Sequence, residues 1–159
     1  MPNNLLVYPS SGAAGPPGPP GSGLAVQMAV DLVGPPFSIP LGGPWIVPGL
    51  GLSGVAPASG AIVVNFNLRF GTAGGPIIAP GLFYAAYLSI NGGPPEEIAR
   101  YKVGAGGPGS GWEAGTFGGS IVFIVPPGPV SVDLFVEASP GGVIELKSSP
   151  IKTSMSLMA

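Results

Sequence analysis

The side chains that most often perform acid–base and metal chemistry are absent from this chain. It has no histidine and no cysteine. That absence removes the commonest general base, the thiol nucleophiles, the serine–histidine–acid triad and nearly all zinc sites. What remains is a small set of carboxylates. Glu96 and Glu97 are adjacent, so in an extended segment their side chains point to opposite faces and cannot share a substrate.

Asp133 and Glu137 lie four residues apart, on one face of an expected strand and about two pleats from each other. A glycosidase needs two carboxylates that face each other across the scissile bond. Asp133 could meet Glu113 or Glu145 across strands, but no supporting groups accompany these residues in the sequence. A carboxylate-based hydrolase is therefore the least favoured function. We predict that the protein is not an enzyme, has no metal site and binds no cofactor.

Two segments match the G-x-G-x-x-G pattern of dinucleotide-binding loops, Gly49–Gly54 and Gly104–Gly109. The pattern binds a dinucleotide when a helix follows it and an acidic residue comes later in the chain. Pro57 and Pro108 disfavour a helix at either place, and a chain with 29 glycines is expected to contain such a match by chance. We predict that both segments are loops.

Aromatic residues are the next candidates for binding. Those able to line a sugar-binding surface are Trp45, Tyr84, Tyr87, Tyr101 and Trp112. Aromatic side chains of a β-sandwich more often fill its core or a subunit contact. Trp112 is the candidate ligand contact, because it lies in a glycine-rich segment, residues 104–119, that we expect to be a loop.

Two arginines lie on the polar faces of expected strands. Arg69 and Arg100 are candidates for ion pairs across a subunit boundary with Glu113, Glu137 or Glu145. The alternative is that they are isolated surface charges, since exposed ion pairs contribute little.

The elements that must position these residues are short segments with β periodicity, beginning at residue 24. In the clearest, residues 61–70, apolar and polar side chains alternate strictly, which predicts a strand with one buried face. Residues 82–90 are apolar on both faces, which predicts a central strand. Asn91-Gly92-Gly93 then predicts a turn into a hairpin partner at residues 98–103.

Further strands are expected at Leu24–Leu32, Trp45–Val55, Ser120–Val125, Val130–Glu137, Val143–Leu146 and Ile151–Leu157. No segment has a sustained helical period free of glycine and proline, so almost no helix is expected. The predicted fold class is all-β. Residues 24–159 should form an antiparallel β-sandwich or jelly roll of about eight or nine short strands.

Residues 1–23 are predicted to form an extended, proline- and glycine-rich N-terminal arm. Glycine recurs every third residue at Gly12, Gly15, Gly18 and Gly21, with prolines between the later ones, as in a collagen triple helix. Three triplets cannot hold a triple helix alone, so this stub is either a stiff polyproline-type spacer or a short trimeric stalk. Ahead of it is a small apolar patch, the predicted anchor to an assembly, formed by Leu5, Leu6, Val7 and Tyr8.

The chain carries few charges for its hydrophobicity. Hydrophobic residues make up 45% and charged residues 8%, against roughly 25% charged in a typical soluble domain. Since assembly interfaces are depleted in charge, this balance predicts that partner subunits cover much of the surface. A net charge of −2 without a basic run argues against nucleic acid or an anionic membrane as partner. No stretch approaches the roughly 20 apolar residues of a membrane-spanning helix.

The Gly-Pro-Pro triplets within residues 12–21, followed by an all-β domain, resemble trimeric collagen-stalk proteins with jelly-roll heads. Most similar are small bacteriophage virion proteins, and the strand, Asn-Gly-Gly turn, strand order of residues 82–103 looks like their jelly rolls. The resemblance implies a homotrimer located in the virion, at the particle surface or tail. Its partners would be further copies of itself and a major capsid or tail protein.

The predicted function is thus a non-enzymatic structural subunit of a phage or virus particle, forming trimers that decorate or stabilise the capsid or project as a fibre head. The alternative is a carbohydrate- or receptor-binding head domain of a tail fibre or of a cell-surface collagen-like protein, with Trp112 in its ligand loop.

Overall fold

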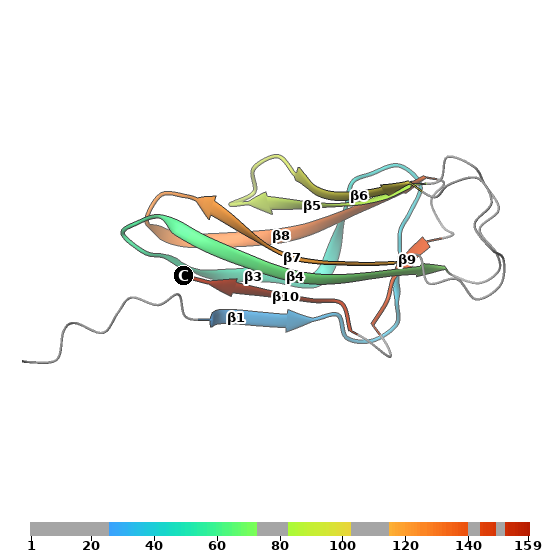
Figure 1. Ribbon diagram of the computed structural model, residues 1–159, viewed down its shortest axis with the longest axis horizontal. Helices are drawn as coiled ribbons and strands as arrows, with labels where there is room; N and C mark the ends of the chain where they lie inside the picture. Colours follow the sequence, from blue (N-terminus) through green and yellow to red (C-terminus); the bar gives the residue numbers. More distant parts are fainter. Residues whose placement is uncertain (1–25, 73–82, 103–114, 140–143, 149–151) are drawn as a thin grey trace, which may run out of the picture.

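The structure is a computed structural model that describes residues 26–72, 83–102, 115–139, 144–148 and 152–159. In these ranges all regular structure is β-strand, arranged as two antiparallel sheets packed face to face (Figure 1). The predicted all-β sandwich is confirmed, and the described ranges contain no helix, including none that could span a membrane.

The larger sheet, sheet A, consists of β1 (Val26–Asp31), β2 (Phe37–Ser38), β4 (Ala61–Thr72), β7 (Gly115–Ile124), β9 (Ile144–Leu146) and β10 (Ser154–Met158). β4 lies at its centre. One edge of β4 pairs with β10 and, further along, with β9, while the other edge pairs with β7. β1 lies beyond β10, and the short β2 lies beyond β9.

The smaller sheet, sheet B, runs in the order β3 (Trp45–Ala56), β8 (Gly128–Ser139), β5 (Phe83–Ile90) and β6 (Glu96–Lys102). The predicted β5–β6 hairpin is confirmed. Asn91 and Gly92 have φ values of 52° and 70°, as a type I′ hairpin turn requires. The Gly93 N–H donates to the Ile90 carbonyl at 2.9 Å and closes the turn.

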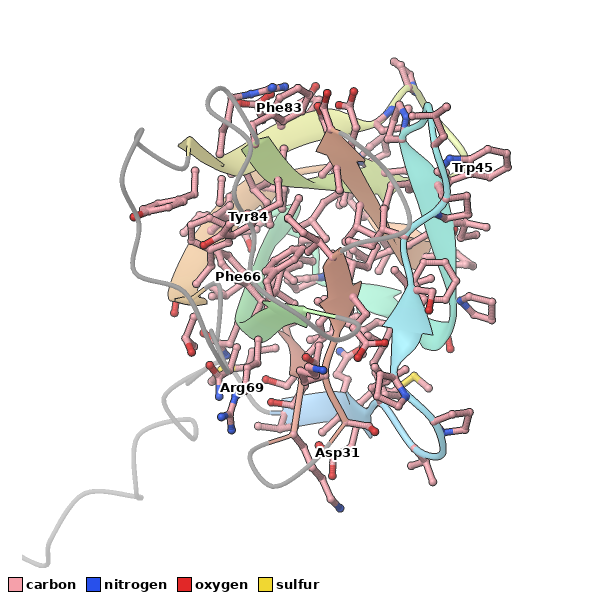
Figure 2. All side chains as sticks on the ribbon, turned by 90° about the vertical axis from the view of Figure 1, so that its right-hand side faces the viewer. Asp31, Trp45, Phe66, Arg69, Phe83 and Tyr84 are labelled. Carbon is pink, nitrogen blue, oxygen red and sulfur yellow. The ribbon has the colours of Figure 1, made fainter. Side chains whose placement is uncertain are left out.

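The core lies between the sheets and is formed by the faces that alternation predicted. From β4, Ile62, Val64, Leu68 and Phe70 are fully buried, and the even-numbered residues of β8 from Val130 to Val136 are buried opposite them. The ring of Tyr84 lies 4.7 Å from that of Phe70, centroid to centroid. Figure 2 shows Tyr84 and Phe66 among the packed interior side chains. Strand alternation therefore decides which residues are inside.

Two glycine-rich segments that their glycine pattern predicted to be loops form strands, and one of them, Gly49–Gly54, lies within the strand predicted at Trp45–Val55. Residues 115–119 are the first half of β7 and pair with β4. A Cβ at Gly119 would meet the Phe66 ring at 3.2 Å, so the missing side chain leaves room for the ring to cover the strand. Gly49–Gly54 lies within β3, where the pairing register with β8 shifts between Ile46 and Gly51. Glycine at such a shift is typical of a bulged strand.

The strands also differ from prediction in number and length. The described ranges hold ten strands, and β3, β4 and β8 each extend over 12 residues. The additional strand is β2, whose two residues are too few to produce a sequence pattern.

Two glycines with nearly the same backbone conformation allow a paired stability test. Gly60 and Gly92 have φ values of 72° and 70°, but an added Cβ at Gly60 would lie 2.3 Å from the Val125 carbonyl oxygen, whereas at Gly92 it would meet nothing within 4 Å. Gly92→Ala should cost about 1–2 kcal/mol, the cost of a left-handed backbone at an L-residue. Gly60→Ala should cost about 1–3 kcal/mol more because of the steric clash. Urea unfolding of both variants measures the difference, and equal losses would contradict the close approach at Gly60.

Candidate assembly surface

The residues predicted to anchor the chain or to bind a ligand lie outside the described ranges. They are Leu5, Leu6, Val7, Tyr8, Gly12, Gly15, Gly18 and Trp112. Their roles stay predictions. A candidate surface must therefore be built from the two sheets and their edges.

The outer face of sheet B carries a connected network of polar side chains. Arg100 on β6 donates to Glu97 at 2.6–3.0 Å and to the Tyr87 hydroxyl at 2.8 Å. The Tyr87 hydroxyl in turn donates to Glu137 of β8 at 2.5 Å. The Arg100 guanidinium also lies 4.4 Å from the ring centroid of Phe83, labelled in Figure 2. The network thus links three adjacent strands, β6, β5 and β8, through their side chains.

The pKa shifts of these groups keep their protonation states fixed at neutral pH, as a structural network requires. The hydrogen bond from Arg100 lowers the pKa of the Glu97 carboxyl, and the same bond raises the pKa of the Arg100 guanidinium. Burial, and then the hydrogen bond to Glu137, raise the pKa of the Tyr87 phenol well above its usual value of 10.0. Glu97 and Arg100 therefore stay charged and Tyr87 stays neutral at neutral pH. A general acid or base would need a pKa near the working pH.

The ion pairs predicted for Arg69 and Arg100 across a subunit boundary stay predictions, and the contacts described here are those within one chain. The ion pairs of Arg100, with Glu97 at 2.6 Å and Glu137 at 3.8 Å, lie within one chain. The i,i+3 spacing of Glu97 and Arg100 does not by itself indicate this contact, because a bulge in the β5–β6 ladder brings them together. Arg69 is only 4% exposed and is not a free surface charge.

The carboxylates considered for hydrolysis are kept apart by the two-layer architecture. Asp133 and Glu137 lie on β8, at the outward positions of sheet B. Glu145 lies on β9 of sheet A and pairs with Lys147. Glu113 lies outside the described residues. Within the described part of the chain, no group of three or more acidic residues could hold a metal ion.

The aromatic residues considered for sugar binding do not form one surface in the described ranges. Tyr84 is 1% exposed and belongs to the core, and Tyr101 stacks against it with centroids 5.2 Å apart. Tyr87 belongs to the polar network. Trp45 is 43% exposed on β3, at the opposite edge of sheet B, where its indole N–H donates to the Gly42 carbonyl at 3.0 Å. Figure 2 shows Trp45 well apart from Phe83 and Tyr84.

The outer face of sheet A has an apolar end, which we call the apolar row. Strand register aligns Val26, Met158, Val63 and Val122 across β1, β10, β4 and β7. Val26 and Val122 are 61% and 62% exposed, and Ile124, two residues along β7 from Val122, is 75% exposed. A contiguous group of exposed apolar side chains is typical of an interaction surface.

Beside the apolar row, the same face is polar and nearly uncharged. Register places Ala29, Ser156 and Asn65 in the next row, and Asp31, Ser154 and Asn67 in the one after. These six residues line a shallow hollow of about 350 Å³. Asn65 accepts a hydrogen bond from Ser120 at 2.5 Å and donates one to Ser156 at 3.3 Å. A neighbour covering these two rows would meet one charged strand residue, Asp31, which pairs with Lys152 at 3.3 Å.

One side of the sandwich, between β1 and β3, is closed by side chains. The Gln27 carboxamide donates to the Val55 carbonyl at 2.9 Å and accepts from the Val55 N–H at 2.6 Å. The Ser53 N–H donates to the Met28 sulfur at 3.1 Å. These bonds replace strand pairing at the edge of β3. Sequence reasoning missed Gln27, whose only signal is a polar side chain in an otherwise apolar segment.

The other side, between β6 and β7, has no such side-chain bridge among the described residues. Among the described residues β7 pairs with β4 alone and β6 with β5 alone, so each presents a free backbone edge. A recess of about 210 Å³ lies between them, at the C-terminal end of β7. Its lining is mixed: Leu88, Ile90, Pro94, Phe123 and Ile124 are apolar, and Glu96 is charged. An apolar side chain fits the apolar part of such a recess better than a charged one.

No known protein family and no curated protein matches the sequence. Two solved structures resemble the fold, with 85% of this chain covered in each. One is the structure of the infectious bursal disease virus Gx strain, at 14% identity and a TM-score of 0.49. The other is that of the Gt strain of the same virus, at 13% identity and a TM-score of 0.44. This chain spans about a third of the matched chains, 32% and 33%. Identities and TM-scores this low transfer no function.

The polar network predicts how stability depends on pH. An unfolded chain ionises its tyrosines near pH 10, whereas the folded protein keeps the Tyr87 proton to higher pH. The contribution of Tyr87 to stability is therefore complete below about pH 10 and is lost as pH rises toward the folded-state pKa. Urea unfolding from about pH 8 to pH 11 should show a steeper loss in the wild type than in Tyr87→Phe. If the stability of the wild type and of Tyr87→Phe fell equally with pH, Tyr87 would have the same pKa in the folded and unfolded chain, which would contradict this prediction.

Proposed function

We propose that this protein is a non-enzymatic structural subunit of a virus or bacteriophage particle. Its copies associate as trimers that decorate or stabilise the capsid or project as a fibre head. The observation that carries the proposal is the apolar row on the outer face of sheet A. Val26, Val122 and Ile124 are each more than 60% exposed there, beside two rows with Asp31 as the single charged residue.

The energetics of the apolar row favour a protein partner. Burying a Val or Ile side chain contributes about 1.5–3 kcal/mol, so covering three of them at once is a substantial driving force. A chain with 8% charged residues also has few ionised groups to oppose contact. Self-association is the simplest form of such contact, because most soluble assemblies are symmetric homo-oligomers.

The polar chemistry of the described residues supports a structural function. The polar network Glu97–Arg100–Tyr87–Glu137 ties three strands of one sheet together, with Glu97 and Arg100 charged and Tyr87 neutral at neutral pH. The particle and the trimer are proposed from the Gly-Pro-Pro triplets and the resemblance that they carry.

The mass of the purified protein in solution tests the proposal. Light scattering should give three times the chain mass of 15.6 kDa. Val122→Asp with Ile124→Asp should raise the dissociation constant at least about a hundredfold, since each lost apolar contact is worth about 1.5–3 kcal/mol and 1.4 kcal/mol is tenfold.

Val33→Asp is the matched control, because Val33 is 81% exposed but lies in the β1–β2 connection, away from the apolar row. It should leave the mass unchanged. A wild-type protein that remains a single soluble chain at high concentration would contradict the proposal.

A further inference from the structure

We infer that residues 5–8 of one copy add as a strand to the free edge of β7 in a neighbouring copy. The inference rests on the proposed function and names the contact that would join its subunits. It starts from the contrast between the two sides of the sandwich, one closed by Gln27 and Met28 and the other without such a bridge in the described ranges. An added strand would pair its backbone with β7 in the way that sheets recruit extended peptides.

β7 lacks the features that protect an edge strand. Proteins guard such edges with charged residues, proline or a bulge. β7 (GTFGGSIVFI) contains no charged residue and no proline, and its ladder with β4 runs without a register shift from Ala61 to Phe70.

The neighbouring edges are protected. β6 carries Glu96, Glu97 and Arg100 and has a register shift against β5. The edge of β3 is occupied by the Gln27 carboxamide at Val55 and contains a register shift of its own. The contrast marks β7 as the least protected of these three edges in the described part of the chain.

The recess at the end of β7 would receive a side chain of the added strand. Leu88 and Ile90 of sheet B and Phe123 of β7 are apolar lining residues, and Glu96 of β6 is the charged one. Residues 5–8 are Leu-Leu-Val-Tyr, four consecutive residues without charge. Alternation in an added strand would direct two of them toward this interior and two toward solvent.

Residues 5–8 could pair with β7 of their own chain or with β7 of a neighbouring copy. The position of β1, where the arm joins the sandwich, favours the neighbouring copy. β1 begins at Val26, which shares a row with Val122 of β7. Three strand spacings separate them, roughly 14 Å at about 4.8 Å each. The 17 residues 9–25 would extend about 50 Å as a polyproline-type segment. A spacer stiffened by Gly-Pro-Pro triplets suits a reach to another copy better than a fold-back over such a short distance.

Site-directed cross-linking of the full-length chain tests the contact, and the absence of native cysteine makes it specific. One chain carries Leu6→Cys or Val7→Cys, and a co-expressed, mass-tagged chain carries Ser120→Cys on β7. Ser53→Cys on β3 is the matched control, because Ser53 and Ser120 are both exposed strand serines, one on the side closed by Gln27 and Met28 and one on the opposite side. A short bismaleimide then joins thiols that lie close together.

We expect the inter-chain product with Ser120→Cys to exceed that with Ser53→Cys at least about tenfold, because docked segments meet at millimolar effective concentration. One of the two arm positions should react much better than the other, since successive residues of a paired strand face opposite sides. Equal yields at Ser120→Cys and Ser53→Cys would overturn the inference. So would a product confined within one chain when Leu6→Cys or Val7→Cys is combined with Ser120→Cys.

Light scattering separates this inference from the proposed function. A multimeric wild type with equal cross-linking yields would leave the structural function standing and remove the strand exchange. A monomeric wild type would remove the proposed function, and the exchange with it.

Discussion

Unpaired backbone N–H and C=O groups at strand edges are the constraint on which this architecture depends. A sheet that is not closed into a barrel always has two edges, and each needs water, a side chain or another strand. Here Gln27 reproduces a strand's hydrogen bonds at Val55 on one side, while β6 and β7 face outward on the other. The two sides of the sandwich therefore differ in how the edges of their described strands are satisfied.

The few charged groups have a local structural use. Arg100, Glu97 and Glu137 account for a quarter of the twelve charged residues, and all three meet around Tyr87. Ala85 lies between Arg100 and Glu137 in strand register and is 0% exposed. These three charges thus cover one part of sheet B, while the ion pairs Asp31–Lys152 and Glu145–Lys147 involve residues of β1 and β9 in sheet A.

The sequence predicted those elements that are marked by a pattern within a few neighbouring residues, such as alternation or a turn motif. Alternation at residues 61–70 identified β4 and its buried face, and Asn91-Gly92 identified the hairpin turn. The glycine-rich first half of β7 escaped prediction, and the bulge within β3 was not foreseen, because a glycine run carries no alternation. Their strand character comes from pairing with β4 and β8, which are distant in sequence. Gln27 and the Arg100 network were missed for the same reason, since both join strands that pair non-locally. The arm and Trp112 lie outside the described residues, so those predictions stay open.

The place of β10 has a consequence for how the chain matures. β10 is inserted between β1 and β4, so the first described strand is held by the last. During synthesis β1 leaves the ribosome early and has no ladder to join until Ser154–Met158 have been made. Sheet completion is thus a late event in which distant segments must meet, and such topologies fold slowly. The outer face of sheet A is therefore complete only once Ser154–Met158 have been made and have inserted between β1 and β4.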